Sequence, residues 1–131
     1  MIDKSIPLTA QANGAVTARL CVKRVGVVNG MPDLALATVG TVVGGEQLAG
    51  ISIEGAADNA MFPYCASGPT WWTAGAAGIA AGVTRLTTDA AGKALAAAAG
   101  DACVADNLAG RAVAADEIFL VNVNLSVWAV A

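Results

Sequence analysis

The sequence predicts an all-β protein, folded as a compact β-barrel or sandwich with at most one short helix. Three observations support this prediction. Apolar and polar residues alternate with a period of two in several segments, which is the pattern of half-buried strands. Fifteen glycines punctuate the 131 residues, as expected for many short strands. The two halves of the chain also resemble each other at an offset of about sixty residues, which predicts two pseudo-repeats of one supersecondary unit.

The similarity between the halves rests on a small set of matched positions. An acidic residue, an amide, Leu, Ala and Gly follow one another in both copies, and an Arg-Leu pair occurs upstream in each. The matched positions are 46–50 with 106–110, Ala37 with Ala97, Gly40 with Gly100, 8–10 with 72–74, and 19–20 with 85–86. The offsets differ between these pairs, so we expect loops of different length. The chain is therefore predicted to be a single domain, 1–131, with one pseudo-repeat over about 5–66 and the other over about 69–128.

Two hairpins are predicted, one in each half. Residues 25–28 and 34–39 flank Asn29-Gly30, a pair that accepts the positive φ angles of a tight turn, and Pro32-Asp33 reinforces the turn. In the second half, residues 85–88 and 93–95 flank a turn at 89–92. The run 93–100 is rich in Ala, a good helix former, but it is short. We expect a strand or a single helical turn there.

Two further strands are predicted from alternation alone. Residues 51–54 form a short one. Residues 121–128 form a longer one, with Val121, Val123 and Leu125 on one face and the polar residues with Trp128 on the other.

The segment 56–78 joins the halves and is predicted to be the least regular part of the chain. Pro63 and Pro69 lack the N–H that a central strand needs, so we expect these stretches along an edge or in loops. Adjacent strand residues face opposite ways, so one of Trp71 and Trp72 should pack inside and the other should not. An intermolecular contact and a core-filling role are both open for this pair. The expected core anchors are Leu20, Leu34, Leu36, Leu48, Ile51, Ile53, Leu86, Leu95, Leu108, Val113, Ile118, Leu120, Val123 and Leu125.

Composition excludes several classes of function. Seven Lys or Arg against ten Asp or Glu give a net charge of -3, and no basic stripe exists, so we expect no nucleic-acid partner. The absence of His removes the Ser-His-Asp and Cys-His catalytic sets and most zinc and haem ligation. Three separated cysteines without a C-x-x-C pair indicate small buried thiols in a reducing compartment. No secretory signal and no uninterrupted apolar run of membrane-spanning length is found, so we expect no membrane partner.

Short catalytic motifs are equally absent. Gly92-Lys93 does not begin a phosphate-binding loop, because Thr87 stands where that motif needs Gly and Ala94 follows the lysine. The dispersed carboxylates do not have the spacing of a calcium loop. We therefore expect no catalytic residue, cofactor or metal. A pair of carboxylates meeting across the fold, as in glycosidases, stays open as a rival.

A resemblance to a known family lies mainly in the second half. The stretch 77–101 runs from Gly-Ile-Ala-Ala-Gly through Thr-Thr-Asp-Ala-Ala-Gly-Lys-Ala to a closing Gly-Asp, and 109–118 leads through Asp116-Glu117 into the last apolar strand. Together with the opening 6–10, these segments resemble the small capsid decoration proteins of tailed bacteriophages, also called cement or head-stabilising proteins. The resemblance covers about residues 5 to 125. Trp71-Trp72 and the tail 122–131 depart from the pattern.

This resemblance implies a non-enzymatic virion protein on the outer capsid surface, made in the cytoplasm of the bacterial host. It would stabilise the shell by bridging subunits of the major capsid protein, and it would form a homodimer or homotrimer. Residues 1–10 would be an arm in which Ile2, Ile6 and Leu8 add a strand to an exposed edge, with an ordinary internal strand as the equal alternative. The expected interface residues are Ile2, Ile6, Leu8, Tyr64, Trp71, Trp72 and Trp128.

A rival from another class is a receptor- or glycan-binding module on the head surface. Exposed aromatic side chains would then serve as stacking platforms for the ligand. A third reading is an enzyme that uses the dispersed carboxylates.

Overall fold

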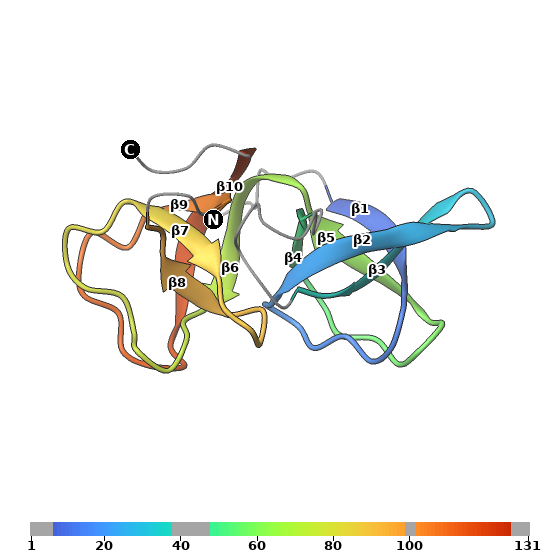
Figure 1. Ribbon diagram of the computed structural model, residues 1–131, viewed down its shortest axis with the longest axis horizontal. Coiled ribbons are helices and arrows are strands. Elements are labelled where there is room, and N and C mark those ends of the chain that lie inside the picture. Colours follow the sequence, from blue (N-terminus) through green and yellow to red (C-terminus); the bar gives the residue numbers. More distant parts are fainter. Residues whose placement is uncertain (1–6, 38–47, 99–101, 127–131) are drawn as a thin grey trace.

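The computed structural model describes residues 7–37, 48–98 and 102–126. Every regular secondary-structure element in these ranges is a β-strand. The prediction of an all-β protein is confirmed. Figure 1 shows two groups of strands side by side along the longest axis, with the β2–β3 turn at one end and long loops of the second half at the other. The strands are β1 (Pro7–Ala12), β2 (Cys21–Val28), β3 (Met31–Leu36), β4 (Leu48–Ser52), β5 (Met61–Cys65), β6 (Ser67–Thr73), β7 (Arg85–Thr88), β8 (Ala94–Ala96), β9 (Cys103–Asn107) and β10 (Ile118–Ser126).

The first five strands close into a barrel and the last five form a second sheet. The barrel order is β1-β3-β2-β4-β5, with β5 returning to β1, and the order in the second sheet is β6-β10-β9-β7-β8. If β6 is matched to β1 and each later strand to its counterpart, the two halves have the same order of neighbours. The parallel pairing of β1 with β3 also recurs, as a single bridge between Ala74 and Ala94.

The residue correspondence between the halves differs from the one that the sequence match predicts. In the sheets, Ala10 pairs with Phe62 and Trp72 pairs with Phe119, so Ala10 corresponds to Trp72 and not to Ala74. The Arg-Leu match is displaced by two residues in the same way. The match of 46–50 with 106–110 is wrong by five residues, because Val22 pairs with Gly50 as Leu86 pairs with Ala105. The match of Ala37 with Ala97 agrees with the structure, because both amides donate to equivalent carbonyls, those of Cys21 and Arg85. Loops of unequal length in the two copies account for these shifts.

Both predicted hairpins are present. Asn29 and Gly30 have φ angles of 53° and 76°, as a two-residue type I′ turn requires. The strand after this turn begins at Met31, so Pro32 and Asp33 lie in β3 and not in the turn. In the second hairpin β8 is a three-residue strand, so the alternative of a helical turn does not hold for Ala94–Ala96.

The segment predicted to be irregular is the largest departure from expectation. It contains β5 and β6, separated by Ala66 alone. β6 is an edge strand, as Pro69 predicts, but β5 is paired on both sides, which was not expected of a strand that contains Pro63. The pairing with β4 ends at Ser52 and Tyr64, just before Pro63, whose carbonyl accepts a hydrogen bond from Ile53. The missing N–H of Pro63 therefore falls at the end of the β4–β5 ladder, and the pairing of β5 with β1 continues through Pro63.

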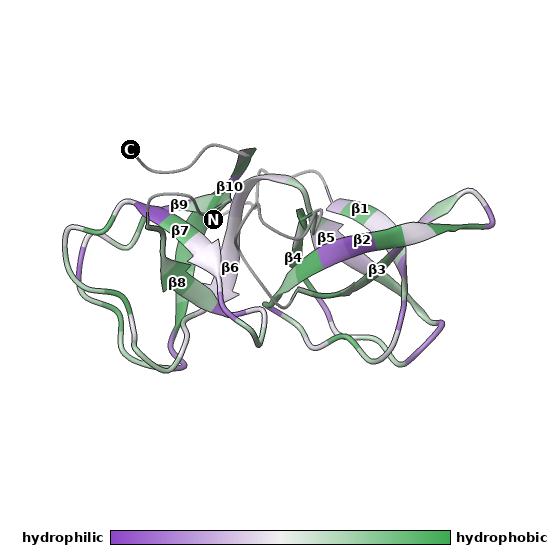
Figure 2. Ribbon diagram, in the orientation of Figure 1, coloured by the Kyte–Doolittle hydropathy of each residue, from purple (hydrophilic) through white to green (hydrophobic). Residues whose placement is uncertain are grey.

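Two hydrophobic clusters form the core. The smaller one fills the barrel, and the larger one lies between the barrel and the second sheet. Cys21, Ile51 and Cys65 belong to the barrel but pack in the larger cluster, so the two halves share a core. All three cysteines are buried, as expected. In Figure 2 most strands are green or white, and a purple stretch marks the Lys23-Arg24 part of β2.

Equivalent core positions in the two halves exchange large and small side chains. Ala10 and Leu34 in the barrel correspond to Trp72 and Ala94 in the second sheet, and all four are buried. The Trp72 indole donates from Nε1 to the Gly92 carbonyl at 3.0 Å, and the Cys21 amide donates to the same oxygen at 2.7 Å. This carbonyl therefore links the two halves.

Candidate interaction surfaces

Within the described ranges, no group of three or more His, Cys, Asp or Glu side chains is placed to hold a metal ion. No helix there is long and apolar enough to cross a membrane. The ionic contacts instead join pairs of side chains: Arg85 with Asp106, Lys93 with Asp116, and Arg111 with Glu117. The places left to consider are surfaces, so the predicted interface residues are located first.

The structure divides the predicted interface residues into three groups. Leu8 and Trp71 are exposed, at 44% and 45%. Trp72 is fully buried and offers no side-chain surface to a partner in this fold, whereas Tyr64 is 6% exposed and lines a hollow. Ile2, Ile6 and Trp128 lie outside the described residues. Residues 7–10 pair with β5, so this described part of the predicted arm follows the internal-strand alternative.

Tyr64 lies at the side of a hollow of about 200 Å³ beside the barrel. Burial raises the pKa of the Tyr64 hydroxyl, and the nearby positive charge of Arg24 acts in the opposite direction. The remaining walls are apolar, and Leu125 of β10 contributes to them, so the hollow also touches the second half. The hollow is large enough for one side chain of a partner. The lining residues are Arg24, Pro32, Leu34, Leu48, Ala49, Tyr64 and Leu125.

The second sheet turns one face toward the barrel and the other away from it. We call the second one the outer face and define it by Trp71, Arg85, Leu95, Asp106, Leu108 and Ile118. The strand pairings place these residues on the face opposite Trp72, Leu86 and Phe119.

Four large apolar side chains are exposed on this outer face. Their exposed fractions are 45% for Trp71, 37% for Leu95, 48% for Leu108 and 52% for Ile118. Leu95, Leu108 and Ile118 were predicted to be core anchors, and this prediction is wrong. Their residue types carry no signal that separates them from core positions. The only signal is the parity of each strand, which depends on the register.

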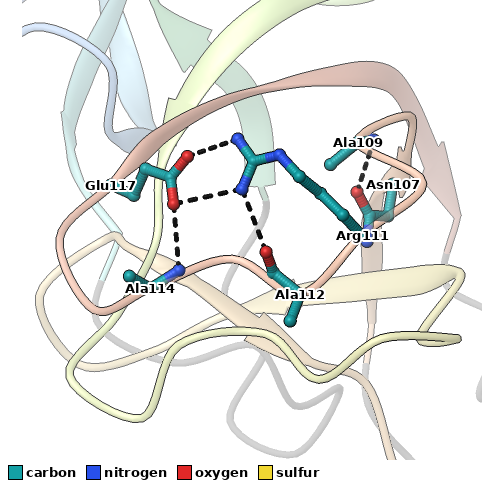
Figure 3. A network of polar contacts seen from close by, with 6 residues as sticks. All are labelled: Asn107, Ala109, Arg111, Ala112, Ala114 and Glu117. Carbon is teal, nitrogen blue, oxygen red and sulfur yellow. Dashed lines mark hydrogen bonds and ion pairs between the residues drawn. The ribbon is translucent and has the colours of Figure 1, made fainter.

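A polar network fixes the loop beside the outer face (Figure 3). Arg111 forms an ion pair with Glu117 and donates from Nη1 to the Ala112 carbonyl at 2.9 Å. Glu117 Oε1 also accepts a hydrogen bond from the Ala114 amide at 3.0 Å. These hydrogen bonds lower the pKa of the Glu117 carboxyl, with Arg111 contributing most, and the same pairing raises the pKa of Arg111. The network holds the loop that leads into β10 and Ile118.

The chain belongs to a class of fold in which two five-stranded β units have the same strand order. Among solved structures it is similar to the crystal structure of the N base of the head fiber gp8.5 in bacteriophage phi29. The two share 12% sequence identity, the match covers 96% of this chain and 98% of that chain, and the TM-score is 0.68. At this identity the likeness shows a shared fold. No protein-family model matches the chain, and a search of curated proteins finds no match.

Proposed function

We propose that this chain is a non-enzymatic structural protein of a bacteriophage head, bound to the outer surface of the capsid. One observation carries the proposal: the fold agrees over almost the whole of both chains with a base that belongs to a phage head fiber. The sequence resemblance of residues 77–101 and 109–118 to capsid decoration proteins points to the same setting.

The proposed partner is the major capsid protein. A chain that touches two neighbouring capsid subunits adds contacts that must break before the shell opens, and a modest free energy per copy is multiplied over the lattice. The exposed apolar side chains of Leu8 and Met61 on the barrel offer surface for such contacts. No step in this role needs a catalytic group.

Binding to heads tests the proposal directly. Purified chain is mixed with heads that lack surface proteins, and the heads are sedimented and analysed for bound chain. We expect saturable binding at a fixed number of copies per head and an increase in the temperature at which the heads open. Heads of an unrelated phage serve as the control. Folded chain that stays in the supernatant with its cognate heads would remove this function.

A glycan-binding module is the second candidate, and Trp71 is the observation that favours it. This residue is 45% exposed, and its indole could stack on a sugar ring. Titration with soluble glycans, followed by tryptophan fluorescence, separates the two candidates. A saturable change that is lost in Trp71→Ala, without binding to heads, would support the glycan module.

A further inference from the structure

The hollow beside the barrel holds two polar side chains whose hydrogen-bonding groups the fold leaves free. The Tyr64 side chain is 6% exposed, and its ring packs against Phe62 with 6.3 Å between the ring centroids. The Tyr64 hydroxyl forms no hydrogen bond to another described residue, and Arg24 forms no ion pair within the described ranges. Both side chains line the hollow. The hydroxyl therefore depends on whatever occupies the hollow, water or a partner, for a hydrogen bond.

The charge at the hollow is complementary to a carboxylate. Of the described residues that line it, only Arg24 is charged and none is acidic. A guanidinium presents several N–H donors in one plane, which matches the two oxygens of a carboxylate. The Tyr64 hydroxyl is a further donor on the same hollow, and the charge of Arg24 is near enough to act on the pKa of that hydroxyl. These two side chains together can bind one carboxylate.

The rest of the hollow and its surroundings match an apolar side chain. All the other lining residues are apolar. Leu8 pairs with Tyr64 and is 44% exposed, and Val27 pairs with Pro32 and is 57% exposed. Because paired residues of neighbouring strands share one face of the sheet, Leu8 and Val27 extend the apolar wall to the surface. An apolar recess with a few placed polar groups is the usual form of a binding site.

We propose that the hollow is a docking pocket for a protein segment in which an apolar side chain stands next to a carboxylate. The apolar side chain enters the hollow, and the carboxylate binds Arg24 and the Tyr64 hydroxyl. The occupant is a protein segment and not a free small acid, because Leu8 and Val27 offer further apolar contact that a molecule confined to the hollow would leave uncovered. The segment belongs to the major capsid protein, an assignment that rests on the proposed function.

The single tyrosine of the chain makes the pocket testable without heads. Intact protein with isotope-labelled tyrosine is titrated with N-acetyl-leucine, which carries an apolar side chain and a carboxylate. N-acetylleucinamide, which lacks the carboxylate, is the matched compound. We expect a saturable shift of the Tyr64 ring signals in NMR spectra, with a dissociation constant in the millimolar range for so small a ligand. The amide should bind about tenfold more weakly, because it cannot form the charged hydrogen bonds.

A pair of variants separates the pocket from general charge effects. Arg24→Gln should reduce the affinity for N-acetyl-leucine to that for the amide. Lys93→Gln removes the same charge from the second half and should leave the affinity unchanged. Far-UV circular dichroism checks that both variants are folded.

Four results of these titrations would overturn the inference. They are a Tyr64 signal that does not respond at the highest probe concentration, equal affinities for the acid and the amide, and equal losses in the two variants. The fourth is a Tyr64 signal that changes with protein concentration alone, since it would assign the hollow to a second copy of the chain.

Binding to heads then identifies the occupant. Arg24→Gln should bind cognate heads about tenfold more weakly than the wild type, and Tyr64→Phe about threefold more weakly, whereas Lys93→Gln should bind like the wild type. If the wild type and both pocket variants bind heads equally well, the pocket inference fails and the proposed function stands. A wild type that binds no heads removes the proposed function, and the capsid as the partner, whatever the titration shows.

Discussion

At the scale of single residues, the pairing across the sheet decides which of the two adjacent tryptophans is buried. The sequence predicts that one of Trp71 and Trp72 is buried, since adjacent strand residues face opposite ways. It does not say which one, because both are the same residue type. The pairing of Trp72 with Phe119 in β10 places Trp72 in the core, and the pairing of Trp71 with Leu120 places Trp71 on the outer face.

Truncation of the two tryptophans should therefore have very different effects on stability. Trp72→Ala removes a fully buried side chain and its hydrogen bond to the Gly92 carbonyl, and should lower the free energy of unfolding by about 3 to 5 kcal/mol. Trp71→Ala should change it by about 0.5 kcal/mol or less, as for other surface positions. Guanidinium denaturation of dilute protein measures both. Equal losses in the two variants would show that the assigned strand faces are wrong.

At the scale of elements, the hairpins were predictable and the register between strands was not. Asn29-Gly30 determines its turn through local backbone geometry, so the sequence is sufficient there. The prediction that Pro63 lies at an edge or in a loop is wrong. A strand paired on both sides tolerates proline where the ladder to one neighbour ends, and for β5 that point depends on the length of β4. Leu95 and Ile118 were assigned to the core for a related reason: an apolar strand residue is buried or exposed according to its register, which is a long-range property.

Gly50 offers a test at this scale. Its φ angle is 150°, and an added Cβ would lie 2.1 Å from the backbone oxygen of Cys65. Gly50→Ala should therefore push β4 away from β5 and reduce the free energy of unfolding by about 3 kcal/mol or more. Gly26→Ala in β2 is the matched control, because its added Cβ meets nothing within 4 Å, and it should change stability by about 1 kcal/mol or less. Thermal melts of the two variants decide this. A Gly50→Ala protein as stable as the control would contradict the close approach.

At the scale of the whole molecule, the shared core is the property that the sequence least revealed. Repetition in the sequence indicates two units but says nothing of how they join. In the structure the barrel is closed by pairing of β1 with both of its neighbours, whereas the second sheet has only the bridge from Ala74 to Ala94 and is covered by barrel residues instead. Side chains on the outside of the barrel therefore complete the core of the second half.

This arrangement predicts a single cooperative unfolding transition. Because Cys21 and Ile51 of the barrel pack in the same cluster as Trp72 and Val121, neither half should remain folded when the other unfolds. Tryptophan fluorescence reports on the second half, since Trp71 and Trp72 lie in β6, and far-UV circular dichroism reports on both halves. The two signals should coincide during urea unfolding. Separate midpoints would show that the halves unfold independently.

The short connection at Ala66 has a mechanical consequence. β5 ends at Cys65 and β6 begins at Ser67, so the covalent link between the barrel and the second sheet has almost no slack. With the Gly92 carbonyl bonded from both sides of the junction, a force applied to one end of the molecule reaches the other through a stiff connection. Under tension the two halves should therefore move as one stiff body and not as two domains joined by a flexible linker.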